Sequence, residues 1–417
     1  MSSEWPLRSL GELTINHDGK RKPVKESERK PGSYPYYGAS GVVDFVDGYL
    51  FDGCHLLIGE DGENLRTRQT PIAFLADGKF WVNNHAHIVT GNDNADTRYL
   101  LYALLNADIS SYLTGAVMPK LTQGNLNRIQ LPCPPREIQE AIVSILGALD
   151  NRIALLRETN ATLEAIAQAL FKSWFVDFDP VRAKSQGLAP TGMDEATAAL
   201  FPDGFEESEI GEMPRGWSVL PVGDAVECVG GATPDTKDER YWSPPEHAWT
   251  TPKDLSGMAS PVLLRTERRI SAPGLARIGS GLLPAGTLLM SSRAPIGYLA
   301  IAQLPLAVNQ GYIAMLPGGR LPPLYLLFWC RQNMELIKAR ANGSTFMEIS
   351  KKAFRPIPAL VPPVQAVAAF EDIASRLFAR IVENERQAQT LATLRDTLLP
   401  RLISGQLRLP EAEALAG

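Results

Sequence analysis

The sequence is poor in the residues and motifs that mark secreted, membrane-embedded or metal-binding proteins. It has only four cysteines in 417 residues and no CxxC pair, which argues against a zinc site and against a disulfide framework. No apolar run approaches the roughly 18 residues of a membrane span, and the first residues lack the basic and apolar segments of a signal peptide. We therefore expect a cytoplasmic protein with reduced, mostly buried thiols, no metal site and no membrane contact.

Catalytic motifs are missing as well. The proline pairs read CPPR, SPPE, LPPL and VPPV, and none follows an Asp or Asn, as the target-amine pocket of an adenine methyltransferase requires. The sequence has no Walker loop, no HExxH and no dinucleotide-type Gly-rich turn. The PDTK stretch at Pro234 to Lys237 lacks the spacing of a nuclease metal site. We expect no catalytic residue in this chain.

The charge is acidic overall but unevenly distributed. The net charge is −5, which by itself argues mildly against a nucleic-acid partner. Residues 1–208 carry 19 basic and 27 acidic residues, whereas residues 209–417 carry 22 basic and 19 acidic ones. Because a local basic patch is enough to meet phosphates, the global balance does not exclude DNA.

Two long helices are predicted at a separation of 228 residues. The stretch PPREIQEAIVSILGALDNRI begins at Pro134, and PPVQAVAAFEDIASRLFARI begins at Pro362. The first helix is expected from about Arg136 to Phe175, with an end at the FDPV stretch because the residue before Pro180 is disfavoured in a helix. Ile145, Ile153, Ile166 and Trp174 are expected to form a stripe beside its seam.

The seam itself repeats every seven residues, as in a coiled coil. The expected pairing positions are Ile142, Leu149, Leu156, Leu163 and Leu170 in the first helix and Phe370, Leu377, Leu391 and Leu398 in the second. Since neither helix can bury its seam alone, the two are expected to pack together, either parallel or antiparallel. Asn384 is the polar member of the second seam, and it either fixes the register or faces solvent.

The repeat extends beyond the helices. WSVLPVGDAVE at Trp217 matches WPLRSLGELTI at Trp5, and both halves alternate short predicted strands with turns. We predict five segments: a first domain at 1–133, a central helix at 134–180, a connector at 181–214, a second domain at 215–361 and a C-terminal helix at 362–408.

Binding signals are better than catalytic ones. HDGKRKPVKESERK forms a basic loop, SYPYYGASG adds tyrosines, and the second half carries Arg, Lys, Asn and Gln in expected loops. Such residues also occur on ordinary solvated surfaces and in cores. The candidate DNA contacts are Lys20, Arg21, Lys22, Lys25, Tyr37, Ser40, Arg66, Arg68, His85 and Lys120 in the first half and Lys237, Arg240, Lys253, Arg293, Asn309, Gln310 and Lys351 in the second.

His85 and His87 in NNHAHI are expected to share one face of a strand. No third ligand lies nearby in the sequence, so hydrogen-bonded or base-reading imidazoles are favoured over a metal pair.

Three blocks of this sequence resemble the specificity (S) subunit of type I restriction-modification systems. They are YPYYGASGVVDFVDGYLFDGCHLLIGEDG, MPKLTQGNLNRIQLPCPPREIQEAIVSILGALDNRI and GATPDTKDERYWSPPEHAWTTPKDLSG. The resemblance implies an α+β fold with two α/β target-recognition domains, each followed by a long helix. It also implies that the helices pair as an antiparallel coiled coil with a pseudo-twofold internal repeat.

The resemblance further implies a division of labour between subunits. This chain would read a split, asymmetric target on double-stranded DNA and dock two modification (M) subunits and the restriction (R) subunits, without catalysis of its own. S-adenosylmethionine, ATP and Mg²⁺ are expected on those partners and no cofactor on this chain. The alternative from another class is a coiled-coil protein-protein scaffold without a DNA role, which the net charge of −5 supports best.

Overall fold

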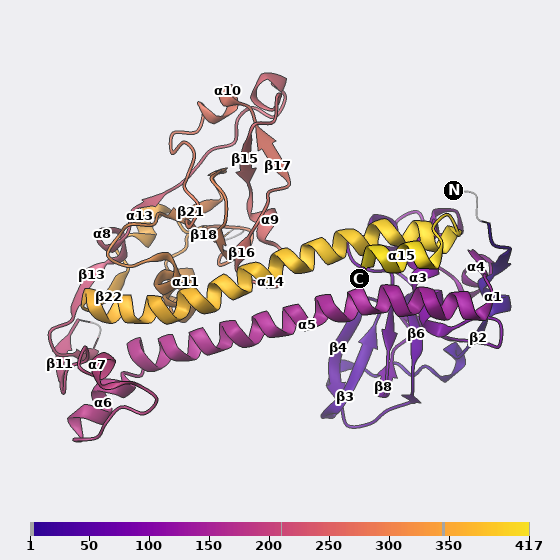
Figure 1. The fold of residues 1–417 in the computed structure, drawn as a ribbon, viewed down its shortest axis with the longest axis horizontal. Helices are drawn as coiled ribbons and strands as arrows, with labels where there is room; N and C mark the ends of the chain where they lie inside the picture. The colour runs from indigo at the N-terminus through magenta and orange to yellow at the C-terminus, as the bar shows by residue number, and fades with distance from the viewer. Residues whose placement is uncertain (1–3, 210, 344–346, 417) are drawn as a thin grey trace. The chain divides into compact units, whose positions relative to one another are not determined.

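The computed structural model describes residues 4–209, 211–343 and 347–416. The chain divides into two compact units. One combines the two ends of the sequence, and the other is formed by the continuous stretch between them. The first unit is Met1–Ile153 with Gln389–Gly417, and the second unit is Ala154–Ala388. Figure 1 labels their elements.

The first unit holds two four-stranded sheets and one strand pair. The sheets have the orders β2-β9-β6-β7 and β4-β3-β8-β5, and β1 pairs with β10. The strand bounds are β1 Leu7–Ser9, β2 Thr14–Asn16, β3 Pro31–Gly38, β4 Gly41–Val46, β5 Phe51–Asp52, β6 His55–Gly59, β7 Ala73–Ala76, β8 Lys79–Val82, β9 Ala86–Gly91 and β10 Gln130–Pro132.

Helices complete the first unit. Outside the long helices they are α1 Leu10–Leu13, α2 Asn64–Thr67, α3 Thr97–Asn106, α4 Gln123–Arg128 and α15 Leu409–Ala416, with short 3₁₀ turns η1 Asp18–Lys20, η2 Glu26–Glu28 and η3 Ser110–Tyr112. The carboxylate of Asp96 caps α3 by accepting the Arg98 and Tyr99 N–H groups. Because strand side chains alternate, Leu56 and Ile58 of β6 join the cluster that contains α3, whereas Leu57 faces the second sheet. The unit is therefore layered as helix, sheet and sheet.

The second unit repeats these layers with different strand lengths. Its sheets have the orders β14-β21-β18-β19-β16 and β17-β15-β20, with the pairs β13-β22 and β11-β12. The strand bounds are β11 Phe205–Ser208, β12 Gly211–Pro214, β13 Ser218–Pro221, β14 Cys228–Val229, β15 His247–Thr250, β16 Val262–Leu263, β17 Arg268–Ile270, β18 Leu288–Ser291, β19 Leu299–Ala302, β20 Leu306–Val308, β21 Tyr312–Met315 and β22 Pro358–Val361.

The helix α11 (Pro323–Gln332) corresponds to α3 and packs on β18 and β19. Its residues Leu324 to Cys330 are all buried, which explains why LYLLFWC is apolar all round. The remaining short helices are α6 Asp179–Ser185, α7 Glu195–Ala198, α8 Val222–Ala225, α9 Pro252–Leu255, α10 Ala272–Leu275, α12 Met334–Ala339 and α13 Lys351–Phe354, with η4 at Glu239–Tyr241.

The two long helices are α5 (Arg136–Phe175) and α14 (Val364–Ser404), and within each unit their segments lie side by side (Figure 1). In the second unit Asn160 contacts Asn384, while Phe171 and Phe175 contact Phe370 near the start of α14. Contacts that advance along α5 therefore move back along α14. The antiparallel pairing is confirmed, and every predicted seam residue is buried or half-buried.

The stripe beside the α5 seam differs from the predicted one. Ile166 is 50% exposed, whereas Asn160 and Ala167 are buried. The buried stripe runs in steps of seven through Leu146, Ile153, Asn160, Ala167 and Trp174. Asn384 is buried too and donates to Asn160 Oδ1 at 2.9 Å, so the solvated alternative for Asn384 is wrong.

Phe171 of α5 lies in the core of the second unit and not on an outer helix face. It is 3% exposed, and its ring lies 5.0 Å from that of Tyr325. Leu155 and Ile166 of the same helix lie on its outer face, at 52% and 50% exposure.

The connector at 181–214 is folded rather than extended. Phe201 is 1% exposed and packs its ring against Trp174 at 5.2 Å and Trp217 at 6.2 Å. The long helix ends for another reason than the one predicted, because Asp179, the residue before Pro180, begins α6. The break lies at Phe178, whose φ of 58° is left-handed.

The four cysteines are free thiols; Cys228 and Cys330 are buried and the other two are half-buried. Among the described residues, no helix combines the length and the hydropathy needed to span a membrane.

Candidate nucleic-acid interface

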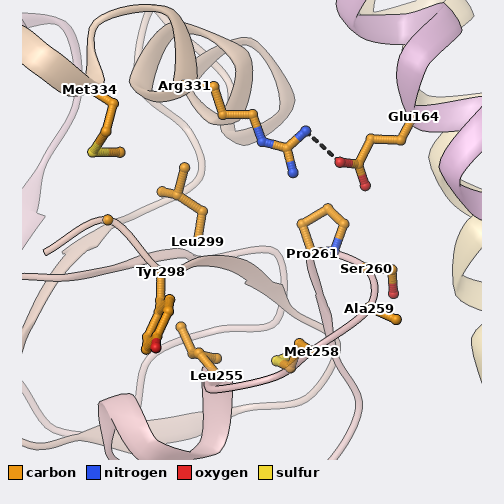
Figure 2. Close-up of a pocket in the computed structure, with 11 residues that line it drawn as sticks. Glu164, Leu255, Met258, Ala259, Ser260, Pro261, Tyr298, Leu299, Arg331 and Met334 are labelled. Carbon is orange, nitrogen blue, oxygen red and sulfur yellow. Dashed lines mark ion pairs between the residues drawn. The ribbon is translucent and has the colours of Figure 1, made fainter. Parts of the chain in front are cut away.

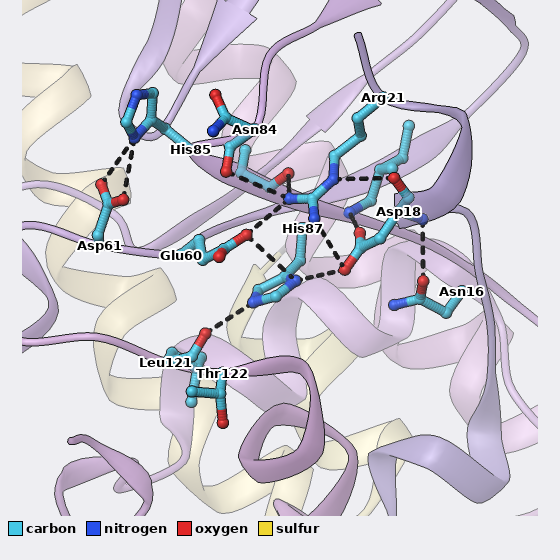
Figure 3. Close-up of polar contacts among 12 residues, drawn as sticks. Asn16, Asp18, Arg21, Glu60, Asp61, Asn84, His85, His87, Leu121 and Thr122 are labelled. Atoms are coloured by element: carbon cyan, nitrogen blue, oxygen red, sulfur yellow. Dashed lines mark hydrogen bonds and ion pairs between the residues drawn. The ribbon is translucent and has the colours of Figure 1, made fainter. Parts of the chain in front are cut away.

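A buried polar cluster lies at the carboxyl end of β6 in the first unit (Figure 3). His87 of β9 places Nδ1 2.5 Å from Asp18 Oδ2 and donates from Nε2 to the Leu121 carbonyl at 2.7 Å. Arg21 donates from Nη1 to Glu60 Oε2 and to the Ala86 carbonyl, both at 2.7 Å. Four charged or ionisable side chains from three separate segments of the chain thus satisfy one another.

Hydrogen bonds keep the two carboxylates of this cluster ionised. Burial raises the pKa of Asp18, but hydrogen bonds from the His87 ring and the Ile88 N–H outweigh it and leave the pKa below its ordinary value. Burial likewise opposes ionisation of Glu60, and the hydrogen bond from Arg21 with the nearby His87 lowers its pKa overall. The cluster is therefore held together by paired charges with little access to solvent.

The rim of the cluster carries two of the predicted contact residues. Lys120 Nζ lies 3.3 Å from Glu60 Oε1, and His85 Nδ1 lies 2.9 Å from Asp61 Oδ2. The side chain of His85 is 54% exposed, whereas that of His87 is 1% exposed. The prediction that the two histidines share a strand face is wrong, because β9 begins only at Ala86. The described residues contain no group of three or more ligands that could hold a metal ion.

Strand registers define which positions of the two units correspond. In each unit two corresponding strand pairs share one strand, which is β9 in the first unit and β21 in the second. The matching partners are Leu56–Val89 and Leu288–Met315 for the inner pair and Asn16–Val89 and Cys228–Met315 for the edge pair. Glu60 N bonds to the His85 carbonyl at 2.9 Å, and Ser292 N bonds to the Gly311 carbonyl at 2.8 Å. Glu60 and Ser292 thus hold equivalent backbone positions.

The charged cluster has no counterpart in the second unit. The equivalent residues are Gly230 for Asp18, Ser292 for Glu60 and Ile313 for His87. A cavity of about 470 Å³ lies there instead, lined in part by Gly230, Gly231, Ser280, Ser292, Gln310 and Lys351. The two units therefore share a backbone frame but differ in what fills it.

The predicted contact residues fall into three groups. Exposed side chains with no ion pair within the described part of the chain belong to Lys20, Lys22, Lys25, Ser40, Lys237 and Lys351. Ion pairs hold Arg21, Arg66, His85, Lys120, Arg240, Lys253 and Arg293.

The third group is held by other contacts. Arg68 donates to the Ala107 carbonyl at 2.6 Å, Asn309 Oδ1 accepts from Gly311 N at 2.8 Å, and Gln310 Oε1 accepts from Thr233 at 2.7 Å. Tyr37 packs its ring 5.6 Å from those of Phe74 and Phe80. Their contacts with DNA stay predictions.

The structure brings some of these residues together. Arg21, Lys120 and His85 meet around Glu60 and Asp61, and Gln310 and Lys351 line one cavity. Asp18, Glu60, Ser280 and Ser292 were absent from the candidates. Their signal in the sequence is weak, because single carboxylates and serines in loops are common on any surface.

A second cavity of the second unit, about 460 Å³ in volume, lies between α5 and the domain loops (Figure 2). Arg331 Nη1 reaches Glu164 Oε1 at 2.5 Å across its edge, with both side chains mostly buried. Met258, Leu299 and Met334 contribute apolar walls. This ion pair links α11 to α5 within the second unit.

A family model described as the type I restriction modification DNA specificity domain matches residues 2–165 and 214–393. The chain belongs to this family. Its two matched stretches coincide with the internal repeat, so each half of the chain carries one specificity domain.

Individual relatives agree. The type I restriction enzyme HindI specificity subunit of Haemophilus influenzae is 26% identical over 356 residues, which cover 74% of this chain and 77% of that protein. The MjaIX specificity subunit of Methanocaldococcus jannaschii is 35% identical over 185 residues, 44% of this chain and 42% of that protein. A crystal structure of the S subunit from M. genitalium shares the fold at a TM-score of 0.58 and 17% identity, covering 96% of both chains.

The two specificity domains enter their helices differently. At the start of α5, Arg136 pairs with Glu140 at 3.0 Å and with Asp96 at 3.2 Å. At the start of α14 the residue after the proline pair is Val364, which is 75% exposed. The two helix starts therefore present different chemistry, one charged and one apolar.

Proposed function

We propose that this chain is the specificity subunit of a type I restriction-modification complex. It binds double-stranded DNA, reads one half of a split target with each unit, and docks two modification subunits and the restriction subunits. The single observation that carries the proposal is the family match over both repeated halves. The units differ at equivalent positions, so the proposed target is asymmetric.

We further propose that the subunit carries no catalysis and acts in the cytoplasm. Methyl transfer with S-adenosylmethionine, and ATP- and Mg²⁺-dependent cleavage, are assigned to the partner subunits. The buried charged side chains of the first unit are paired with one another, which suits a structural role better than acid-base chemistry. The alternative of a scaffold without DNA recognition rests on the net charge of −5 alone.

The outer faces of the long helices are the proposed docking surfaces for the modification subunits. Leu155, Ile166 and Ile373 are 52%, 50% and 40% exposed there. Exposed apolar side chains on a helix pair favour association with partner helices. Co-expression with the modification subunit should therefore increase the yield of monodisperse chain, and a chain that is equally monodisperse alone contradicts this docking surface.

Methylome sequencing of the host with and without the gene tests the function. The expected result is a two-part adenine-methylated motif that disappears on deletion and returns on complementation. An unchanged methylome in a host whose modification subunit is expressed would contradict the proposal. Methylation by the purified chain alone would contradict the assignment of catalysis to the partners.

A further inference from the structure

We propose that the cavity lined by Gly230, Ser292 and Lys351 in the second unit binds one phosphate group of the DNA backbone. This anion cavity, as we call it, is the 470 Å³ space described above. The inference rests on the proposed DNA-binding function and adds a defined subsite to it.

Buried hydroxyl groups provide the first evidence. Ser292 is 3% exposed, and its Oγ finds no hydrogen-bond partner among the residues that the structure describes. Ser280 Oγ, which lines the same cavity, is likewise buried and unpartnered within that part of the chain. A buried hydroxyl without a partner is costly, so two of them facing one cavity point to a ligand that accepts hydrogen bonds.

Lys351 supplies the charge. A Cβ atom on Gly230 would lie 3.3 Å from Lys351 Nζ, so the ammonium group rests directly over the glycine and uses the space that a side chain would fill. Lys351 has no ion pair among the described residues. Glu348, the carboxylate in the lining, is itself paired with Arg293 at 3.6 Å. The cavity therefore presents an unneutralised cation and hydroxyl donors.

The first unit shows what this backbone frame holds when the chain supplies the anion itself. There Asp18 and Glu60 occupy the positions of Gly230 and Ser292, and their carboxylates are paired with His87 and Arg21. In the second unit the carboxylates are replaced by a glycine and a serine, and the ammonium group of Lys351 lies beside that glycine. An anion from outside the chain completes the second unit as the two carboxylates complete the first.

A phosphate fits this chemistry better than a base. Tyr312 is the aromatic residue of the lining, but its ring is 2% exposed and its hydroxyl lies 3.1 Å from Thr250 Oγ1. It offers no face on which a base can stack. Charged donors and hydroxyls are the groups that contact phosphate oxygens in protein–DNA complexes.

The test compares Lys351→Gln with Lys352→Gln in the full chain complexed with its modification subunit. Lys352 is the exposed neighbour on α13 and is not among the cavity residues. Lys351→Gln should weaken binding to every duplex about tenfold and reduce the slope of log K against log salt by about 0.9, the value for one phosphate. Lys352→Gln should leave that slope within about 0.3 of the wild-type value.

Neutral methylphosphonates placed one at a time along the duplex identify the phosphate. One position should weaken wild-type binding and have no further effect on Lys351→Gln. Ser292→Glu, which introduces the carboxylate of the first unit, should mimic the loss seen with Lys351→Gln while thermal melting stays unchanged.

Two results would overturn the proposal. One is a Lys351→Gln complex that behaves like Lys352→Gln, and the other is relaxed preference at a single base pair with an unchanged salt slope, which marks a base contact. If the wild-type complex binds the duplex and either result is found, the anion cavity is contradicted and the proposed function is not. A wild-type complex that binds no duplex removes the proposed function as well.

Discussion

The two units fill equivalent positions of the same backbone frame with different groups. At the carboxyl end of β6 the first unit buries Asp18 and Glu60 against Arg21 and His87. At the equivalent end of β18 the second unit leaves a cavity beside Gly230 and Ser292. The strand registers around both are the same. The comparison teaches that backbone pairing specifies the frame, and that the polar content of the frame can change independently of it.

Buried carboxylates also differ between the units. Asp18 and Glu60 have lowered pKa values because paired hydrogen-bond donors outweigh burial. Glu371 of α14 in the second unit is mostly buried and accepts a hydrogen bond from Tyr325 N at 3.2 Å. Burial raises the pKa of Glu371 to about 7, because that hydrogen bond only partly offsets it. The units should therefore respond to pH in opposite directions.

The helix pair shows the same contrast. In the first unit Arg395 Nη1 lies 2.7 Å from Asp150 Oδ1, with side chains 30% and 36% exposed. In the second unit the helix pair buries Asn160 of α5 and Asn384 of α14, at 2% and 0% exposure. A half-exposed ion pair can return to water when broken, whereas a buried amide pair cannot.

The largest expected effect comes from Asp18→Ala. Removing this carboxylate leaves the buried ring of His87 without its partner, while Arg21 keeps Glu60, and the first unit should lose about 3–5 kcal/mol. Amide hydrogen exchange should accelerate in β6 and β9 and stay unchanged in β18 and β21. Asp44→Ala, which breaks a half-buried pair with Arg29 away from the cluster, is the control and should alter neither. Equal loss of protection in both units would show that they do not unfold separately.

Glu371→Gln should stabilise the second unit in a pH-dependent way. The unfolded carboxyl has a pKa near 4.5 and the folded one near 7, so wild-type stability falls as pH rises between these values and then levels off. The variant escapes this loss, by up to about 3 kcal/mol above pH 7 and little near pH 5.

Thermal melting at pH 5 and pH 8 measures that difference. Glu383→Gln, an exposed change on the same helix, is the matched control. A gain for Glu371→Gln of the same size at both pH values would contradict the assigned ionisation.

Asn384→Leu should cost about 1–3 kcal/mol, because the Asn160 amide stays buried without its partner. The double variant Asn160→Leu with Asn384→Leu should recover most of this loss. Arg395→Leu, which breaks the ion pair with Asp150 in the helix pair of the first unit, should cost about 0–1 kcal/mol. Urea denaturation of the four proteins separates these outcomes, and a larger loss for Arg395→Leu would reverse the comparison.

The smallest effects are expected from Lys253→Ala and Arg293→Ala, whose side chains already pair with Glu267 and Glu348. A phosphate contact should lower affinity for all duplexes and flatten the salt slope by about one unit, while a base contact relaxes one position by about 1–3 kcal/mol.

Asp61→Ala is the control in the first unit for those two variants. Asp61 pairs through its backbone with Lys120, as Arg293 pairs through its backbone with Glu348. It should not weaken binding. Unchanged binding of Lys253→Ala and Arg293→Ala at every salt concentration would remove both residues from the interface.

The long helices were predictable because heptad spacing is a local property of the sequence. Their seam and their repeat follow from apolar residues seven apart. The buried stripe beside the α5 seam was not predictable. Asn160 is polar and Ala167 is small, whereas the exposed Ile166 is strongly apolar. Burial at those positions depends on the facing helix, which period alone does not reveal.

The candidate site was less predictable than the fold. Asp18, Glu60 and His87 come from three separated segments and meet only through the sheet order β2-β9-β6. A single sequence does not specify that order. The basic loop was recognised as a cluster of cations, but the inward turn of Arg21 depends on Glu60, 39 residues away.

The composition of the first unit has a consequence for synthesis. Leu398, Leu402 and Ile403 of α14 belong to the same core as Ile142 and Leu146 of α5. The ribosome must make residues 154–388 before these core residues exist. At about 5–20 residues per second this delay is roughly 10–50 s, during which the apolar face at the start of α5 stays open to chaperones and to other nascent chains. Truncation before residue 389 should therefore leave the N-terminal domain aggregation-prone even though its own sheets are intact.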